Sequence, residues 1–404
     1  MGLPISLCMI VRDEAQRLPA CLTSVRDLVA ELIVVDTGST DDTAAIAQAH
    51  GARVYPFAWR DDFAAARNYS LTLAQQPWIL VLDADEILLP AAVAGLREAI
   101  ADPTVLVVNL WRQEMGAPQA PYSLVSRLFR NRPDIRFRGA YHELIDDSIA
   151  QIQQREPHWR VATLETVALQ HWGYTQDRVP DKQARARRLL TQAVAQQPQD
   201  AYLCAKLAAV YLADGDYDAA LQLLQQALAT QPAEPMVQYE IHFHLGLLHQ
   251  RQGQMTLAQT HYQAALATAC PPRVKLGAYT NLGALYQEQG DFHRARDLFW
   301  QAVQSAPDWA LGYYNLGLAY RGLQQLPAAL QAYQKALELD PDLAAAHQNV
   351  GVVWCKLGDL PRAQHHWRRA IALYQQQGSP AGHQLQQQLE TLGLWTPCEP
   401  DFPC

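Results

Sequence analysis

A repeated hydrophobic pattern in the C-terminal half constrains the fold more than any other feature of the sequence. An aliphatic residue followed by a small one recurs at intervals of 38, 37, 34 and 34 residues, beginning at Leu207, Leu245, Leu282, Leu316 and Val350. Four residues after each of these positions stands an aromatic residue or a histidine, and thirteen residues after it stands an alanine. A period of this length is typical of repeat proteins, whose successive units stack around a shared core.

The pattern resembles the tetratricopeptide repeat (TPR), a helix-turn-helix unit of similar period. The resemblance predicts an all-α superhelix of five repeats over residues 201–375. A linker and a capping half-repeat helix are expected at 181–200, and a C-terminal helix and tail at 376–404. Such a superhelix has a concave groove that suits an extended peptide or a partner helix.

One position of the predicted groove, directly before the Leu-Gly pair, carries an amide in three successive repeats, namely Asn281, Asn315 and Asn349. An amide side chain both donates and accepts hydrogen bonds, so it can pair with a peptide backbone whatever the peptide's sequence. We therefore expect these residues to contact a peptide acceptor or a protein partner. Asparagine is also the usual residue at this position of such repeats, and a purely structural role is the alternative.

The N-terminal 180 residues alternate short β-branched runs with helical stretches. Strands are expected at 5–11, 31–38, 52–58 and 78–86, and helices at 14–30, from the capping box at Ser39 to Gly51, and at 61–76. Strand–helix alternation with almost uninterrupted apolar strands is typical of a parallel sheet that is covered on both faces. In such sheets, ligands bind outside the carboxyl ends of the strands.

Charge and composition exclude several classes of protein. The net charge of −8 argues against affinity for nucleic acid or for an anionic membrane. No apolar run reaches the ~20 residues that a transmembrane helix needs, and no CxxC pair suggests zinc, so we expect a cytoplasmic protein with reduced cysteines. The first lysine is Lys182, which leaves the N-terminal domain without a Walker A or Schiff-base lysine.

Carboxylates stand where the predicted strands end. Asp36 ends the second strand, and Asp83 and Asp85 end the fourth. Alternation along a strand would place Asp83 and Asp85 on one side, where a divalent cation would offset their mutual repulsion. A solvated acidic turn is the alternative interpretation.

Four segments together resemble the nucleotide-sugar-binding domain of family-2 glycosyltransferases, which has a Rossmann-like GT-A fold. They are ISLCMIVRDEAQRLPACLTSV, LIVVDTGSTDDT, DDFAAARNYSLTLA and WILVLDADE. The resemblance implies that Asp36 contacts a uracil-type base, that Arg67 contacts the nucleotide, and that Asp83 holds the ribose and a metal ion. It also implies that Asp85 is a direct ligand of Mn²⁺ or Mg²⁺.

The first loop is expected to complete the nucleotide-sugar site with Arg12 and Glu14. Here the sequence departs from the family, because Asp13 stands where an asparagine often precedes the glutamate.

Inverting transfer, which is usual in this family, requires a base that takes the acceptor's proton. Related repeat-bearing members have a His-Glu pair and an H-x-G-Y element in the region after the fourth strand. The resemblance makes Glu143 the candidate base, with Asp146 and Asp147 next in line, and His142 or His171 a third metal ligand. If residues 140–145 are extended, only one of His142 and Glu143 can face the site.

Five arginines in this region are candidates for holding the diphosphate or an anionic acceptor, with a solvated basic face as the alternative: Arg127, Arg130, Arg132, Arg136 and Arg138.

The leading hypothesis is a metal-dependent inverting glycosyltransferase. It would move a sugar from a nucleotide-sugar donor, expected to be a UDP-sugar, to an acceptor that the repeats recruit. A polypeptide and a cell-envelope glycan are the candidate acceptors. The main alternative is a TPR adaptor with an inactive glycosyltransferase-like domain. A haloacid-dehalogenase-type phosphatase is disfavoured because DADEI follows the fourth strand rather than the first, and no GxGxxG supports a dinucleotide oxidoreductase.

Overall fold

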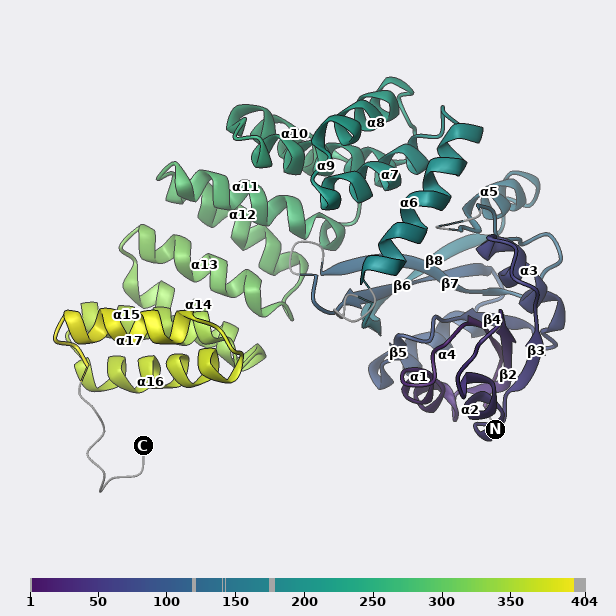
Figure 1. Ribbon diagram of the computed structural model, residues 1–404, viewed down its shortest axis with the longest axis horizontal. Coiled ribbons are helices and arrows are strands. Elements are labelled where there is room, and N and C mark those ends of the chain that lie inside the picture. The colour runs from purple at the N-terminus through teal and green to yellow at the C-terminus, as the bar shows by residue number, and fades with distance from the viewer. Residues whose placement is uncertain (1, 118–120, 140, 142, 174–178, 396–404) are drawn as a thin grey trace. The chain divides into compact units, whose positions relative to one another are not determined.

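The computed structural model describes residues 2–117, 121–139, 141, 143–173 and 179–395. The chain forms two compact units, Met1–His244 and Leu245–Cys404. The first unit contains the α/β domain together with the helices of the first repeat (Figure 1). In the described ranges, no helix combines the length and the apolar character that crossing a bilayer requires.

The α/β domain is built on an eight-stranded sheet with the order β3-β2-β1-β4-β7-β6-β8-β5. The first four of these strands are parallel, as predicted. β7 then pairs antiparallel with both β4 and β6, β6 pairs parallel with β8, and β5 pairs antiparallel with β8. The strands are β1 (Leu3–Val11), β2 (Val29–Asp36), β3 (Arg53–Pro56), β4 (Trp78–Val81), β5 (Glu86–Leu88), β6 (Val105–Glu114), β7 (Tyr122–Arg130) and β8 (Arg160–His171).

Both faces of the sheet are buried, as the apolar strands predicted. On β4, Leu80 belongs to one core cluster and Ile79 belongs to another. The same division separates Val34 from Ile33 on β2. Because successive side chains of a strand point to opposite faces, the two clusters lie on opposite sides of the sheet. The covering helices are α1 (Leu18–Val25), α2 (Thr43–Ala49), α3 (Phe63–Leu73), α4 (Val93–Ala101) and α5 (Asp146–Arg155).

Two of the predicted helix starts are wrong. α1 begins at Leu18 rather than at residue 14 and gives way to β2 at Val29. The capping box at Ser39 does not form, because the Ser39 hydroxyl accepts a hydrogen bond from the backbone N–H of Asp13 at 3.0 Å. α2 therefore begins only at Thr43.

The predicted fourth strand is also interrupted. β4 ends at Val81, and β5 begins at Glu86 and pairs with β8 instead. Glu86 closes the turn between them, because its carboxylate accepts from the N–H of Asp83 at 2.9 Å and its own N–H donates to the Asp83 carbonyl at 3.0 Å. Asp83 and Asp85 consequently lie in a turn, so the expectation that strand alternation places them on one side is wrong.

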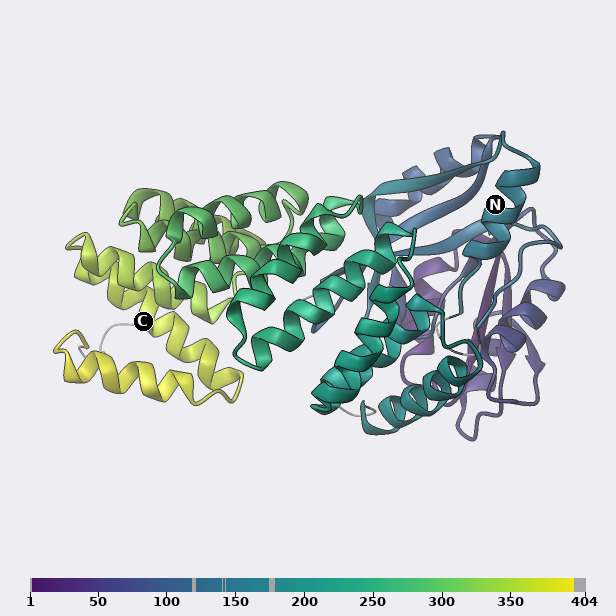
Figure 2. The same ribbon diagram turned by 90° about the horizontal axis from the view of Figure 1, so that it is seen from above.

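The C-terminal part consists of antiparallel helix pairs (Figure 2). The glycine of the recurring Leu-Gly pair has a steric reason. A Cβ atom at Gly283 would lie 2.5 Å from the ring of Phe299 on the next helix. The helices are α6 (Val179–Gln196), α7 (Ala201–Asp214), α8 (Tyr217–Ala229), α9 (Pro235–Arg251), α10 (Met255–Ala267), α11 (Leu276–Glu288), α12 (Phe292–Ser305), α13 (Ala310–Gly322), α14 (Leu326–Leu339), α15 (Ala344–Lys356), α16 (Leu360–Gln376) and α17 (Ala381–Thr391).

Candidate active site at the sheet edge

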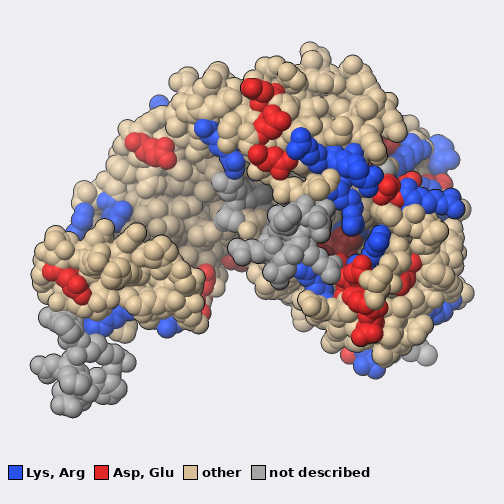
Figure 3. Space-filling view, viewed as in Figure 1, with Lys and Arg blue, Asp and Glu red and all other residues tan. Residues whose placement is uncertain are grey.

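The carboxyl ends of three parallel strands meet at one edge of the α/β domain. Val11 of β1 pairs with Asp36 of β2, and Cys8 of β1 pairs with Val81 of β4. The loops that follow these strands carry most of the predicted site residues. Acidic and basic side chains gather beside one another around a recess on the face of the first unit shown in Figure 3.

Arg67 joins three segments of the chain. It lies on α3, whose first turn is capped by Asp62 accepting from the N–H of Ala65 at 2.9 Å. Its buried guanidinium donates to Asp83 Oδ1 at 2.5 Å and to the carboxylate of Glu143. The structure therefore brings the predicted nucleotide contact, the first aspartate of the DxD motif and the predicted base together.

Asp83 is held by two arginines. Arg127 Nη2 donates to Asp83 Oδ2 at 2.6 Å, while Arg67 binds the other carboxylate oxygen. Burial alone would raise the pKa of Asp83, but the two guanidinium groups lower it well below its usual value. Both oxygens of Asp83 accept from arginines, and its role as a metal or ribose ligand stays a prediction.

The ion pairs continue from Arg127 to the other side of the DxD turn. Arg127 also donates to Glu86 at 3.1 Å, and Arg112 Nη1 donates to the same Glu86 oxygen at 2.7 Å. Arg112 Nε donates to Glu114 at 2.8 Å, and Glu114 Oε2 lies 2.5 Å from His171 Nδ1. We call the resulting series the charge chain, and its members in order are Glu143, Arg67, Asp83, Arg127, Glu86, Arg112, Glu114, His171 and Asp85.

His171 lies between two carboxylates near the end of the charge chain. Its Nε2 lies 3.5 Å from Asp85 Oδ1, opposite the contact of Nδ1 with Glu114. Burial would lower the pKa of His171, but hydrogen bonds to Asp85 and Glu114 raise it to about 9. A carboxylate behind a histidine is the arrangement that orients metal-binding histidines in proteins.

A glycine allows the chain to pass close to this pair. A Cβ atom at position 173 would overlap the His171 ring and would lie 3.3 Å from Asp85 Oδ2. The H-x-G-Y element thus has a physical reason for its glycine, while Tyr174 lies outside the described residues.

Asp85 and His171 form a two-residue donor set whose chemistry fits a divalent cation. An oxygen and an imidazole nitrogen together suit a first-row ion such as Mn²⁺. In the described ranges, no group of three or more His, Cys, Asp or Glu side chains is placed to hold a metal ion. The predicted ligand His142 lies outside those ranges.

Glu143 is presented by a short closed loop. Arg138 and Leu144 exchange two backbone hydrogen bonds, of 2.9 and 3.0 Å, and the loop between them carries Glu143 to Arg67. The alternative bases lie beyond this loop in the first turn of α5, where Asp147 Oδ2 pairs with Arg138 at 3.4 Å.

The remaining predicted nucleotide contacts lie at the end of β2 and on the loop after β1. Asp36 Oδ1 accepts from the N–H groups of Gly38 and Ser39 at 2.9 and 2.8 Å. The N–H of Glu14 donates to Thr43 Oγ1 at 2.8 Å, which ties the first loop to α2, and Arg12 is exposed. The structure thus places these residues at the same edge as the DxD turn.

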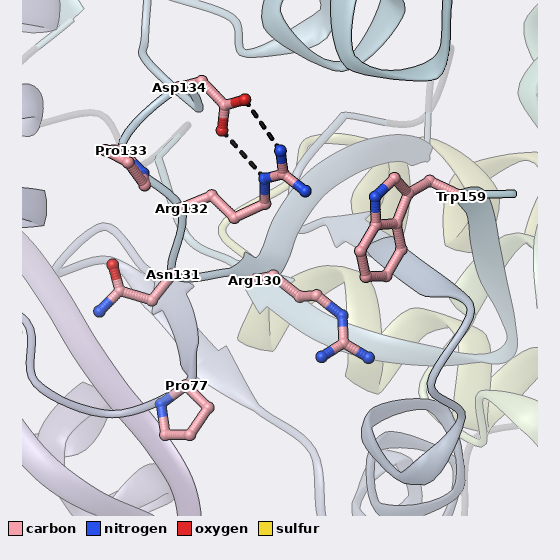
Figure 4. Close-up of a pocket in the computed structure, with 7 residues that line it drawn as sticks. All are labelled: Pro77, Arg130, Asn131, Arg132, Pro133, Asp134 and Trp159. Carbon is pink, nitrogen blue, oxygen red and sulfur yellow. Dashed lines mark hydrogen bonds and ion pairs between the residues drawn. The ribbon is translucent and has the colours of Figure 1, made fainter. Parts of the chain in front are cut away.

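Two of the five candidate phosphate arginines lie at the opposite end of β4. Arg130 pairs with Trp78, the first residue of β4, and its guanidinium lies 4.8 Å from the Trp78 ring. The guanidinium also lies 4.9 Å from the ring of Trp159, and both side chains are drawn in Figure 4. Arg132 binds Asp134 and Glu156 there. Their proposed contact with the diphosphate is therefore wrong, and of the five arginines it is Arg127 that binds Asp83.

The sequence analysis missed Glu86, Arg112 and Glu114. Arg112 and Glu114 are two residues apart in the mostly apolar strand β6, so they share a face of the sheet. Two opposite charges at this spacing in a buried strand were the available signal.

Two of the three asparagines that precede a Leu-Gly or Val-Gly pair are already hydrogen-bonded to other residues of the repeats. Asn281 Nδ2 donates to Tyr262 Oη at 3.2 Å, and Asn349 Oδ1 accepts from Arg321 at 2.7 Å. Both amides are buried, whereas Asn315 is half-buried. Peptide capture stays a prediction, and it would require Asn281 and Asn349 to exchange these bonds.

The matching family models divide the chain in the same way. The model of glycosyl transferase family 2 matches residues 6–161, and three tetratricopeptide repeat models match 182–241, 238–308 and 310–343. Among solved structures, MamA of Desulfovibrio magneticus RS-1 is 27% identical, and the match covers 44% of this chain and 97% of that chain with a TM-score of 0.39.

Curated relatives match different shares of the chain. A TPR repeat-containing protein of Synechococcus elongatus is 50% identical over 264 residues, which are 65% of this chain and 66% of that protein. The SPbeta prophage-derived glycosyltransferase SunS of Bacillus subtilis is 33% identical over 147 residues, 34% of each chain. The lipopolysaccharide core biosynthesis glycosyltransferase LpsC of Rhizobium meliloti is 32% identical over 139 residues, 33% of this chain and 50% of that protein.

The mixed sheet with a charged ligand edge, the stacked helix pairs and the family matches all give the same assignment. The chain carries a domain of glycosyl transferase family 2 over residues 6–161, followed by tetratricopeptide repeats.

Proposed function

We propose that this chain is a metal-dependent inverting glycosyltransferase that uses a UDP-sugar as donor. The observation that carries the proposal is the turn between β4 and β5, where Asp83 is paired with two buried arginines and Asp85 faces His171. The two aspartates of the DxD motif thus have different surroundings. Asp83 lies in a cationic environment, and Asp85 lies beside a second potential metal ligand.

The arginines suit a diphosphate leaving group. Breaking the bond between the anomeric carbon and the diphosphate develops negative charge on the leaving oxygens, and guanidinium groups share such charge through paired N–H donors. Arg67 Nη1 and Arg127 Nε are buried and have no hydrogen-bond partner among the described residues. Leaving such groups unpaired costs about 1–3 kcal/mol each, and a bound diphosphate would supply their partners.

A divalent cation held by Asp85 and His171 would neutralise further charge on the diphosphate. Glu114 supports this role because it fixes the orientation of the His171 ring from behind.

Glu143 is the proposed base. It is the carboxylate that the closed loop 138–144 brings to Arg67, at the end of the charge chain opposite Asp85. A general base accepts the proton of the attacking hydroxyl as the new glycosidic bond forms. Glu143 can do so once the donor's phosphates compete for Arg67 and release the carboxylate.

The repeats are proposed to recruit the acceptor, because a stack of helix pairs offers an extended surface. A polypeptide and a cell-envelope glycan are the candidate acceptor classes. The second class is favoured by the relative LpsC, whose name places it in lipopolysaccharide core biosynthesis.

The proposal is tested by calorimetric titration with UDP, GDP and ADP, each in the presence of Mn²⁺ and again in EDTA. We expect UDP to bind only with the metal, and Asp85→Ala to abolish this binding without unfolding the protein. Asp297→Ala, which removes a carboxylate exposed on α12, is the matched control and should bind as the wild type does. If none of the three nucleotides binds the wild type, the chain is instead a TPR adaptor with an inactive transferase-like domain.

A further inference from the structure

Tyr141 connects the α/β domain with the first helices of the repeats, all within the first compact unit. Its ring centroid lies 5.6 Å from that of Phe63 on α3, with the two rings edge to face. Tyr141 also packs against a cluster formed by Leu190 of α6 and by Leu203 and Leu207 of α7. One aromatic side chain therefore contacts both the transferase domain and the repeats.

The position of Tyr141 is coupled to that of Glu143. Both residues belong to the loop that the Arg138–Leu144 backbone pair closes. Tyr141 contacts Phe63, and Glu143 contacts Arg67 four residues further along α3. Residues four apart lie on the same face of a helix, so the loop docks on one face of α3 through two neighbouring contacts.

The repeat helices approach the same region through polar groups. Arg188 of α6 pairs with Asp61, just before α3, at 2.8 and 3.1 Å, and because both side chains are half-exposed this pair contributes little to stability. On α7, Lys206 Nζ lies 4.9 Å from the centre of the Tyr202 ring. Burial raises the pKa of Tyr202 to about 12, and Glu143 is one of the carboxylates that add to this rise.

On the basis of the function proposed above, we propose that Tyr141 is a positioning residue through which α6 and α7 hold the Glu143 loop in the transferase site. The first repeat is then a structural part of the active site in addition to any role in recruiting the acceptor. Tyr141 acts through Glu143 and does not itself contact the donor. Its contribution comes from the aromatic ring, so Tyr141→Phe should preserve this role.

The packing role is tested by hydrogen–deuterium exchange of the full-length protein, which needs no ligand. The backbone amides of Arg138 and Leu144 are hydrogen-bonded to each other's carbonyl groups and report on the closed loop. We expect Tyr141→Ala to raise their exchange rates by about tenfold or more, because losing the anchor lets the loop open locally. Tyr141→Phe should exchange as the wild type does, and so should Trp300→Ala, which removes an exposed aromatic ring from α12. Unchanged exchange in Tyr141→Ala would overturn the inference.

The catalytic consequence is tested by separating donor binding from turnover. UDP affinity with Mn²⁺ is measured by calorimetry, and turnover is measured as UDP release from UDP-glucose and UDP-N-acetylglucosamine with water as acceptor. Tyr141→Ala should keep its UDP affinity within about twofold and lose about tenfold or more in turnover, since misplacing a catalytic group costs rate rather than donor binding. Tyr141→Phe should restore the rate.

Equal losses of affinity and turnover, or full turnover in Tyr141→Ala, would contradict the positioning role. If Tyr141→Ala proves unfolded by circular dichroism, Tyr141→Leu takes its place in both measurements, because it keeps the apolar contacts but not the ring. If the wild type binds no UDP, the proposed function fails. The exchange result then decides by itself whether Tyr141 anchors the loop.

Discussion

Arg67 Nη2 lies 2.5 Å from Asp83 Oδ1, so the first aspartate of the DxD motif is already neutralised by a buried arginine before any donor binds. Arg127 holds the other oxygen of the same carboxylate. In a buried cluster, removing one partner leaves the others as uncompensated charges. Asp83 is therefore important for the stability of the domain as well as for the donor.

We predict that Asp83→Asn lowers both the stability of the domain and its affinity for the donor nucleotide. The substitution keeps the shape of the side chain but leaves Arg67 and Arg127 without their shared counter-charge. We expect a loss of about 1–3 kcal/mol in the free energy of unfolding, less than for a fully buried pair because Asp83 is 32% exposed. UDP binding with Mn²⁺ should also be lost. Urea denaturation and calorimetry measure the two effects, and Asp297→Asn is the exposed control. An unchanged unfolding midpoint would show that the arginines find other partners.

Glu143→Gln should separate binding from transfer. The amide keeps the size of the side chain and can still accept a hydrogen bond from Arg67, so UDP affinity should stay close to that of the wild type. The variant cannot accept the acceptor's proton, and turnover should fall by about 10²–10⁴-fold. Turnover is measured as UDP release from UDP-sugars, and UDP affinity is measured by calorimetry. If Glu143→Gln keeps its turnover, the base lies elsewhere, and Asp146→Asn and Asp147→Asn are the next variants to compare.

The glycine of the H-x-G-Y element offers a test of the metal site that substitutes none of the proposed ligands. In Gly173→Ala, the new methyl group collides with the His171 ring and must move it away from Asp85. We expect the affinity for Mn²⁺ and for UDP with Mn²⁺ to fall by about 10–100-fold, the range typical of disturbing a group that orients a metal ligand. Glu114→Gln should have a similar effect because it removes the carboxylate behind the same histidine. Wild-type Mn²⁺ affinity in both variants would exclude His171 as a ligand.

The sequence predicted the parts of this site that depend on local chemistry. The parallel strands, and with them the placement of Asp36 and Asp83 at one edge, follow from apolar runs and from the register of neighbouring strands. The interruption after Val81 was not predictable, because Glu86 pairs with His171 of β8, which is 85 residues away in the sequence. The carboxylate and the N–H of Glu86 also close the turn through bonds to Asp83. Glu114 and Arg112 were missed for the same reason, since their partners come from β5 and β8.

The repeats contain a histidine pair that should make their stability depend on pH. His347 Nδ1 lies 3.0 Å from His366 Nδ1, and His365 is adjacent. Burial, together with His347 and His365, lowers the pKa of His366 to about 4, and burial lowers that of His347 despite its bond to the Pro341 carbonyl and the nearby Asp342. Both rings are therefore held neutral in the folded protein.

A histidine whose pKa is lowered by folding binds its proton more readily in the unfolded chain. The unfolded state then takes up protons first as the pH falls below about 6.5, and stability is lost progressively between that value and about 4. We predict that His366→Gln reduces this loss, so that the melting temperature of the variant falls less than that of the wild type between pH 7 and pH 4.5. Thermal unfolding followed by circular dichroism measures the difference. His383→Gln, on the exposed face of α17, is the matched control and should behave as the wild type does. Equal losses in the wild type and in His366→Gln would assign the acid sensitivity to other groups.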